Sequence, residues 1–253
     1  MSSAWRSAVA VLALVAATGG ALLAQDFRRG RRVPVIESAK VAYDGRFAFV
    51  RLRYGGSSAG GFRREPPWAH DYPRADWHFQ RILEEITFTR TYRDESNIFT
   101  LDDPDLFQFP VAYMSEPGFW TMGDAEAEAL RAYVAKGGFL IFDDFRDGHW
   151  ANLEVQMRRV VPDLRWQTLD ATHPIFHSFF DINALPAEGY YGAASWLGLF
   201  EDNDPGKRLV AVANHNHDLG EFWEFSDEGF MPVDLSNEAY KFGVNYVIYA
   251  MTH

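Results

Sequence analysis

The stretch Gly137-Gly138-Phe139-Leu140-Ile141-Phe142-Asp143-Asp144 decides the fold of this chain. Four consecutive apolar residues that end on two aspartates are typical of a strand buried on both faces of a parallel sheet. The two glycines end a helix that we predict over residues 124–136, because glycine is favoured just past a helix C-terminus. A helix that leads directly into a buried strand is the repeating unit of an α/β domain.

The segments on either side repeat this alternation. Further strands are predicted over residues 47–53, 88–92, 110–114 and 208–213. A helix that opens near Pro73 has apolar residues at helical spacing, namely Phe79, Ile82, Leu83 and Ile86. Other helices are predicted over 149–160 and 236–251, and Thr121 with Asp124 predicts a capping box before the helix at 124. The pattern indicates a doubly wound, mostly parallel sheet in a three-layer α/β/α domain.

Composition and charge exclude several classes of function. The chain has no cysteine, which excludes disulfides, thiolate metal sites and a cysteine nucleophile. Residues 1–32 hold five arginines and one aspartate, a net charge of +4. Because the formal net charge of the whole chain is −11, residues 33–253 have a net charge of −15. Such an acidic body argues against nucleic-acid binding, which needs a basic face, and is compatible with cation binding.

The N-terminus has the features of an export signal. Arg6 precedes an apolar run over 8–17, and small residues follow as far as Ala24. Arginines at 28–32 disfavour translocation, so a retained short membrane anchor is the alternative. We expect a signal peptide or membrane anchor over 1–24, a basic linker over 25–40 and one domain over 41–253. The protein is then exported, periplasmic or envelope-associated in a bacterium.

Polar residues follow the predicted strands at the points where these end. They are Arg53-Tyr54, Ser115-Glu116, Asp143-Asp144 and His215-Asn216-His217-Asp218. Ligands of open parallel sheets bind beyond the carboxyl ends of the strands, so we expect these side chains to line one ligand-binding crevice. An antiparallel strand would send its cluster to the opposite edge.

Asp143 and Asp144 are the candidate catalytic residues. A carboxylate at the end of a buried strand is partly desolvated and can act as a general base or as a ligand for a hard cation. The alternative is that one of them caps the next helix and the other pairs with an arginine. No cofactor is predicted, and a divalent metal of unspecified identity remains an alternative.

Three other segments have weaker signals. His215 and His217 are two residues apart, which on an extended strand would place both imidazoles on one face, as in a zinc or iron site. The pattern favours instead a loop of solvated or hydrogen-bonded histidines. Residues 102–105 predict a turn or helix cap rather than a calcium loop. The long loop 55–73, with Trp68, His70 and Tyr72, would either contact a sugar or cover the site. The chain has no Gly-rich phosphate loop, G-x-S-x-G elbow or H-E-x-x-H motif.

Five separated motifs resemble a bacterial family called domain of unknown function 4159. They are residues 73–78 (PRADWH), 113–118 (YMSEPG), 137–144 (GGFLIFDD), 172–177 (THPIFH) and 243–250 (GVNYVIYA). The resemblance covers nearly all of residues 41–252. It implies a flavodoxin-like fold, similar to class I glutamine amidotransferases and to trehalose-utilisation proteins. Asp143 and Asp144 then stand where an amidotransferase has its cysteine, so glutaminase chemistry is lost.

Two functions remain open at this point. The first is a ligand-binding or protein-interaction module of the cell envelope, whose partner is a small polar ligand or an envelope protein. The alternative is a hydrolase of carbohydrate or another envelope polymer, in which Asp143 or Asp144 acts as base or metal ligand. A purely structural partner in a membrane-associated complex is the third reading.

Overall fold

The computed structural model describes residue 36, residues 40–56 and residues 65–253. The predicted leader over 1–24 and nearly all of the linker over 25–40 lie outside the described residues. Within the described part, no helix combines the length and the apolar character needed to cross a membrane.

A seven-stranded sheet forms the centre of the domain. Its order is β2 (Asn97–Thr100), β1 (Val50–Arg53), β3 (Val111–Ser115), β4 (Phe139–Phe145), β9 (Leu209–His215), β8 (Ser195–Phe200) and β5 (Gln167–Thr168). The five strands from β2 to β9 are parallel, whereas β8 is antiparallel to both of its neighbours. The strands β6 (Glu188–Gly189) and β7 (Gly192–Ala193) form a separate antiparallel pair.

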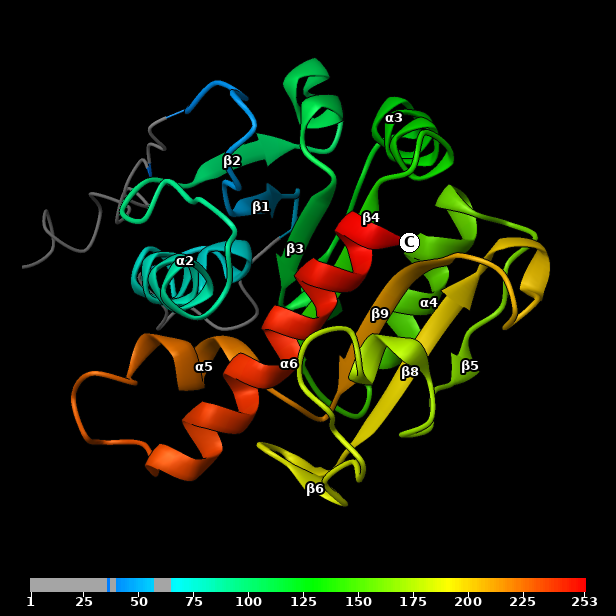
Figure 1. Cartoon of the computed structure of the whole chain (residues 1–253). Coiled ribbons are helices and arrows are strands. Elements are labelled where there is room, and N and C mark those ends of the chain that lie inside the picture. The colour runs from blue at the N-terminus through cyan, green and yellow to red at the C-terminus, as the bar shows by residue number, and fades with distance from the viewer. Residues whose placement is uncertain (1–35, 37–39, 57–64) are drawn as a thin grey trace, which may run out of the picture. The chain divides into compact units, whose positions relative to one another are not determined.

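Helices cover both faces of the sheet, as predicted (Figure 1). One face packs against α3 (Asp124–Ala135) and α4 (His149–Val160), and the other against α2 (Arg74–Ile86), α5 (Leu219–Glu224) and α6 (Val233–Thr252). Short 3-10 helices are η1 (Pro67–Ala69), η2 (Pro104–Gln108), η3 (Pro117–Phe119), η4 (Pro174–Phe176) and η5 (Glu201–Asn203). The three-layer, mostly parallel α/β/α class is confirmed.

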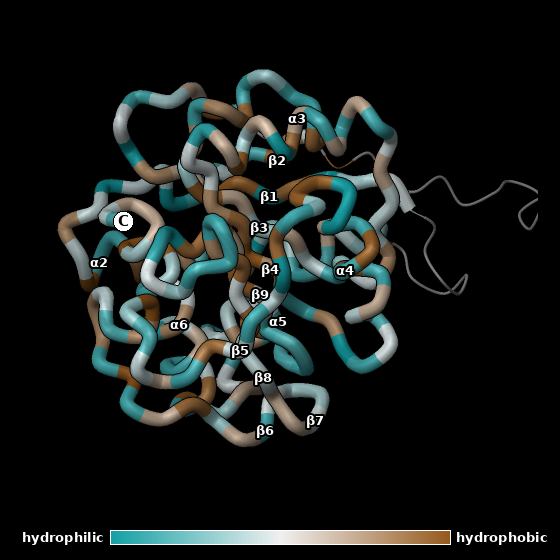
Figure 2. The backbone as a smooth tube through the Cα atoms, turned by 90° about the vertical axis from the view of Figure 1, so that its right-hand side faces the viewer, coloured by the Kyte–Doolittle hydropathy of each residue, from teal (hydrophilic) through white to brown (hydrophobic). Residues whose placement is uncertain are grey.

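Alternation along the buried strands builds two separate cores. In β1 and the residues before it, Ala48, Val50 and Leu52 join the core under α3 and α4. Phe47 and Phe49 join the core under α2 and α6, because successive strand residues point to opposite faces. Figure 2 shows the central strands mostly in hydrophobic colours and the surrounding turns mostly in hydrophilic ones.

Two local predictions were wrong, and one strand was missed. The outer strand is β2 rather than 88–92, where Thr91 forms an isolated bridge to Phe47 and Phe88 is exposed. The N-cap of α3 is Gly123, whose N–H donates to the Glu126 carboxylate at 2.7 Å, while Thr121 forms a bridge with Gly55. The antiparallel β8 was not predicted. In contrast, the cap expected at 102–105 is present, since Asp103 accepts from the Asp105 N–H at the start of η2.

Candidate functional site

The carboxyl ends of β1, β3, β4 and β9 meet at one edge of the sheet, because these four neighbouring strands are parallel. The Tyr54 hydroxyl, which follows β1, donates to the carbonyls of Ser115 at 2.9 Å and Glu116 at 2.6 Å. Ser115 Oγ donates to Asp144 Oδ2 at 3.1 Å. Segments from distant parts of the sequence are thus hydrogen-bonded around the end of β4.

The backbone at this edge repeatedly adopts left-handed conformations. Glu116, Asp144 and Asn216, at the ends of β3, β4 and β9, have φ values of 48°, 57° and 60°, and Asp71 has a φ of 64°. The register between β4 and β9 shifts between Phe142 and Phe145. Because this bulge interrupts the alternation of the strand, consecutive residues Asp143 and Asp144 both turn their carboxylates into the same polar network.

Asp143 has a structural role. Its Oδ2 accepts from the Tyr113 hydroxyl at 2.9 Å and from the N–H groups of Leu219 at 2.8 Å and Gly220 at 3.1 Å. Its Oδ1 accepts from Asn214 Nδ2 at 2.9 Å. The carboxylate, which is fully buried, therefore holds the first turn of α5 against the sheet. These contacts resemble the helix-capping alternative, although the helix is α5 and not the next one along the chain, and a catalytic role of Asp143 stays a prediction.

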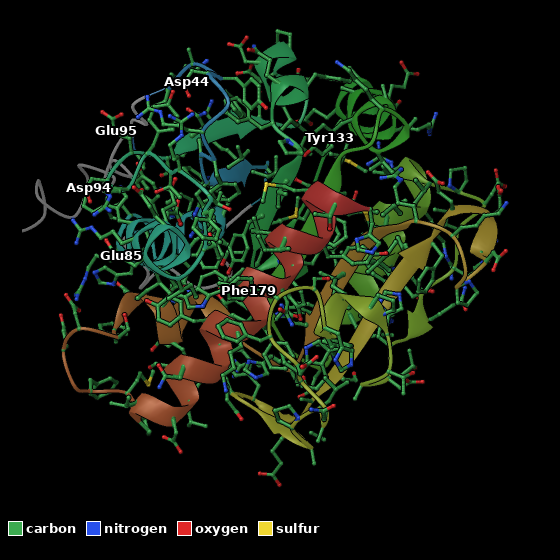
Figure 3. The ribbon with its side chains drawn as sticks, in the orientation of Figure 1. Asp44, Glu85, Asp94, Glu95, Tyr133 and Phe179 are labelled. Carbon is green, nitrogen blue, oxygen red and sulfur yellow. The ribbon has the colours of Figure 1, made fainter. Side chains whose placement is uncertain are left out.

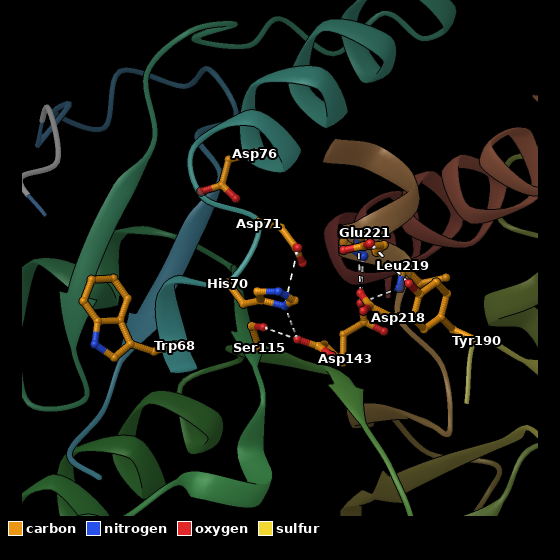
Figure 4. Close-up of polar contacts among 12 residues, drawn as sticks. Trp68, His70, Asp71, Asp76, Ser115, Asp143, Tyr190, Asp218, Leu219 and Glu221 are labelled. Carbon is orange, nitrogen blue, oxygen red and sulfur yellow. Dashed lines mark hydrogen bonds and ion pairs between the residues drawn. The ribbon is translucent and has the colours of Figure 1, made fainter. Parts of the chain in front are cut away.

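Asp144 instead joins a charged cluster with His70 and Asp71, from the loop between η1 and α2. His70 Nδ1 lies 2.7 Å from Asp144 Oδ2 and 3.5 Å from Asp71 Oδ1, and Figure 4 shows the contact between His70 and Asp71 as a dashed line. Asp71 is 3% exposed, yet neither of its carboxyl oxygens accepts a hydrogen bond from a residue that the structure describes. A buried carboxylate without such a partner is costly.

Tyr191 links Asp144 to a third aspartate. Its hydroxyl lies 2.6 Å from Asp144 Oδ1 and 3.1 Å from Asp218 Oδ2. The hydroxyl is thus shared as a donor between the two carboxyl groups. Asp218 is fully buried and also caps α5, where its Oδ1 accepts from the Glu221 N–H at 2.9 Å.

The electrostatics of the cluster push the pKa values of its members apart. Burial opposes charge on His70, but the hydrogen bond to Asp144 and the charges of its acidic neighbours raise the His70 pKa to about 9. Burial likewise opposes charge on Asp144, but the His70 contact outweighs it and lowers the Asp144 pKa. Burial raises the pKa values of Asp71 and Asp218 well above the usual range, and the charge of Asp144 raises both further. Burial also raises the pKa of Asp143, to about 6.

Acidic residues at the surface differ from this cluster because arginines neutralise them. Asp94 and Glu85, beside α2 at the periphery of the domain, pair with Arg81 and Arg93 (Figure 3). At the site, by contrast, the buried arginine Arg51 is committed to Asp76, with Nη2 and Oδ1 2.6 Å apart and both side chains fully buried. Arg51 also donates to the carbonyls of Trp68 and His70 and thereby fixes the loop that carries His70.

The cluster contains two overlapping sets of metal-ligating groups that share His70. One ligating atom from each of His70, Asp144 and Asp218 lies within 4.8 Å of the others, and the same is true of His70, Asp71 and Glu221. Imidazole nitrogen with carboxylate oxygens suits first-row divalent ions such as zinc or manganese. The cluster can therefore hold a cation or transfer protons.

Of the site residues predicted from the sequence, Tyr54, Ser115, Glu116, Asp143, Asp144 and Asp218 lie at this edge. The structure does not bring Arg53 and Trp68 to it as expected. Arg53 is exposed, and Trp68 is 7% exposed in the core below α3 and α4, with its indole pointing away from the carboxylates in Figure 4. A buried indole cannot contact a sugar face.

His215 and His217 do not share a face, and both accept or share hydrogen bonds, as the favoured loop reading expects. β9 ends at His215, and Asn216 adopts a left-handed conformation that breaks the alternation. The His215 ring packs against Phe145 and Trp150, whereas His217 packs against rings of the opposite core, including Phe242. Neither histidine belongs to the two metal-ligating sets. Burial lowers the pKa of His217 to about 4.

Sequence reasoning missed Asp71, Tyr191, Glu221 and Arg51, and treated His70 only as a loop residue. These residues lie outside strand ends, on which the expectation was based. The adjacent acid and histidine at 70–71, next to a predicted helix start, were the available signal. Nothing in the local pattern around Tyr191 marks it.

The comparisons with known proteins give a family and no activity. The model of the family described as "Domain of unknown function (DUF4159)" matches residues 48–251. No curated protein matches the chain.

Proposed function

Because the chain belongs to this family of unknown function, we propose its function from the site alone: the domain is a ligand-binding module that takes up a positively charged ligand at the carboxyl edge of its sheet. The observation that carries the proposal is Asp71, which is almost fully buried while both of its oxygens lack a hydrogen bond from the described residues.

The charge around Asp71 supports a cation as the missing partner. Asp144 and Asp218 are also buried, and the cationic groups nearest to Asp71 are His70 and Arg51. Arg51 is already paired with Asp76, and among the described residues His70 forms the ion pairs with Asp71 and Asp144. Carboxylate oxygens accept and do not donate, so they match a cation, whereas the oxygens of a phosphate would meet further acceptors.

Access to the cluster lies past side chains that are only half-buried. The His70 side chain is 21% exposed, and Tyr191 and Glu221 are of intermediate burial. This arrangement favours a small ligand over an extended polymer.

The test is a binding measurement with paired variants. We would titrate the protein with spermidine, divalent metal ions and inorganic phosphate by calorimetry, and repeat this with Asp71→Asn and with the exposed Asp102→Asn as control. We expect at least one cation to bind and phosphate not to bind. Asp71→Asn should weaken the binding of that cation, and Asp102→Asn should not. Asp71→Asn should not lower Tm, because the carboxylate makes no hydrogen bonds to lose. Equal affinities in the two variants would overturn the proposal.

A second candidate function is hydrolysis. The contact with His70 lowers the pKa of Asp144 despite burial, whereas burial raises the pKa of Asp218, and the Tyr191 hydroxyl lies between them. Two carboxyl groups whose pKa values shift in opposite directions are suited to general base and acid roles. The test is the release of reducing sugar from envelope polysaccharides. Activity that is lost in Asp144→Asn and retained in Asp102→Asn would support hydrolysis. The placement of the protein in the cell envelope stays a prediction from residues 1–24.

A further inference from the structure

We infer that the positively charged ligand is a divalent transition-metal ion, bound by an imidazole nitrogen of His70 and by one carboxylate oxygen each from Asp144 and Asp218. This inference rests on the proposed cation-binding function and names the class of its ligand. Besides Asp144 at the end of β4, the ligands are His70 and Asp218, which lie on two loops at the same edge of the sheet.

The separations fit a single ion with a small adjustment. The three ligating atoms lie within 4.8 Å of one another. Two ligands of one ion, with bonds of about 2.1 Å, lie roughly 3 to 4 Å apart. The 2.7 Å contact between His70 Nδ1 and Asp144 Oδ2 is slightly shorter than that. The imidazole must therefore withdraw a little when the ion replaces the proton of this hydrogen bond, and its partial exposure leaves it room.

Asp71 gives independent support for an ion at this point. Its Oδ1 lies 3.5 Å from the same nitrogen of His70, so an ion bound to that nitrogen would lie beside a buried oxygen that lacks a hydrogen-bond donor. The carboxylate fits only because residue 220 is glycine, since a Cβ there would lie 2.3 Å from Asp71 Oδ2. The packing thus keeps an otherwise unfavourable carboxylate in place next to the ligand set.

The donor types favour a metal ion over an organic cation. A metal ion binds the lone pair of an imidazole nitrogen directly, and histidine is the commonest metal ligand among side chains. A nitrogen ligand also favours zinc or manganese over calcium and magnesium, which prefer oxygen ligands alone.

Surrounding donors hold the two carboxylates in position. Ser115 and Tyr191 donate to Asp144, and the Glu221 N–H donates to Asp218. Such outer contacts orient metal ligands and limit their loss of conformational entropy on binding. The ligands come from separate segments on a rigid sheet edge, so the site needs little rearrangement.

The experiment is calorimetric titration of the metal-stripped, untagged full chain with Zn²⁺ and Mn²⁺, then with Mg²⁺, Ca²⁺ and spermidine. The variants are His70→Gln and Asp144→Asn, with His177→Gln as the matched histidine control outside the site. Asp218→Asn is left aside because Asp218 also caps α5. Substitution with Co²⁺ gives a second readout, since its visible spectrum reports nitrogen and oxygen ligation.

We expect one Zn²⁺ or Mn²⁺ per chain, with affinity at least tenfold weaker in His70→Gln and Asp144→Asn and unchanged in His177→Gln. Binding that is unaffected in His70→Gln overturns the ligand assignment. Binding of spermidine without any metal would overturn this inference and leave the cation-binding function standing. Failure of every cation to bind would overturn both.

Discussion

Nδ1 of His70 lies 2.7 Å from Oδ2 of Asp144, although 74 residues separate the two in the sequence. The contact joins the loop before α2 to the end of β4. It depends on Arg51, which donates to the His70 carbonyl at 2.8 Å and is itself fixed by Asp76. A buried ion pair in the core thus sets the position of a partly exposed member of the cluster.

The first prediction concerns that ion pair. Asp76→Asn leaves the guanidinium of Arg51 buried without its counter-charge, and we expect the free energy of unfolding to fall by about 3 kcal/mol. Urea denaturation of the full chain measures this. Asp227→Asn is the control, because it removes the exposed partner of Arg74 and should cost less than about 1 kcal/mol. Similar losses in the two variants would contradict the prediction.

The second prediction separates Asp143 from Asp144. Asp143→Asn places an amide N–H₂ among groups that all donate, so we expect a loss of about 2 to 3 kcal/mol in the free energy of unfolding. The exposed Asp102→Asn should change it by less than about 0.5 kcal/mol. If Asp143→Asn unfolds at the wild-type urea concentration, Asp143 is not the structural residue that its hydrogen bonds indicate.

The third prediction concerns Tyr191, which contacts two proposed ligands without being one. Tyr191→Phe should weaken metal binding by about tenfold, the usual effect of losing an outer contact to a metal ligand. Calorimetry with Zn²⁺ measures this change in Kd. The neighbouring Tyr190, whose hydroxyl contacts Glu221, is the control, and Tyr190→Phe should bind nearly as the wild type does. Equal Kd values in the two variants would show that Tyr191 has no positioning role.

The fourth prediction is a pH dependence away from the site. Burial lowers the pKa of His173, which accepts from the Ile175 N–H at the start of η4. Its contribution to stability is therefore present above the unfolded-state pKa of 6.5 and is lost as the pH falls through the lower folded-state value. In His173→Asn the new side chain still accepts a hydrogen bond at this cap but does not titrate. This variant should therefore lose less stability than the wild type between pH 6.5 and pH 5.

His177 supplies the control of opposite sign. A hydrogen bond to the Ala171 carbonyl raises the pKa of His177, so its contribution is present below pH 6.5 and is lost as the pH rises through the raised value. His177→Gln should therefore lack the gain of stability that the wild type shows as the pH falls from the raised value to 6.5. Denaturant midpoints on both sides of pH 6.5 decide the two cases, and identical pH dependence in all three proteins would refute the assignment.

The sequence by itself determined the layers of the fold and part of the site. Runs such as 139–142 can be buried only inside a sheet that helices cover on both faces, and the family resemblance is confirmed over residues 48–251. The convergence of Ser115, Asp144 and Asp218 followed from parallel strands alone. The further likeness to glutamine amidotransferases stays a prediction.

Only the tertiary structure decided which carboxylate is structural and which side chains complete the cluster. Asp143 and Asp144 are alike in sequence, but a bulge and a left-handed φ give one to the first turn of α5 and the other to His70. Tyr191 and Asp71 reach the site from segments whose local patterns predict only loop. Local patterns report periodicity and burial, whereas the direction of a side chain at a strand end depends on a single backbone angle and on neighbours far away in the chain.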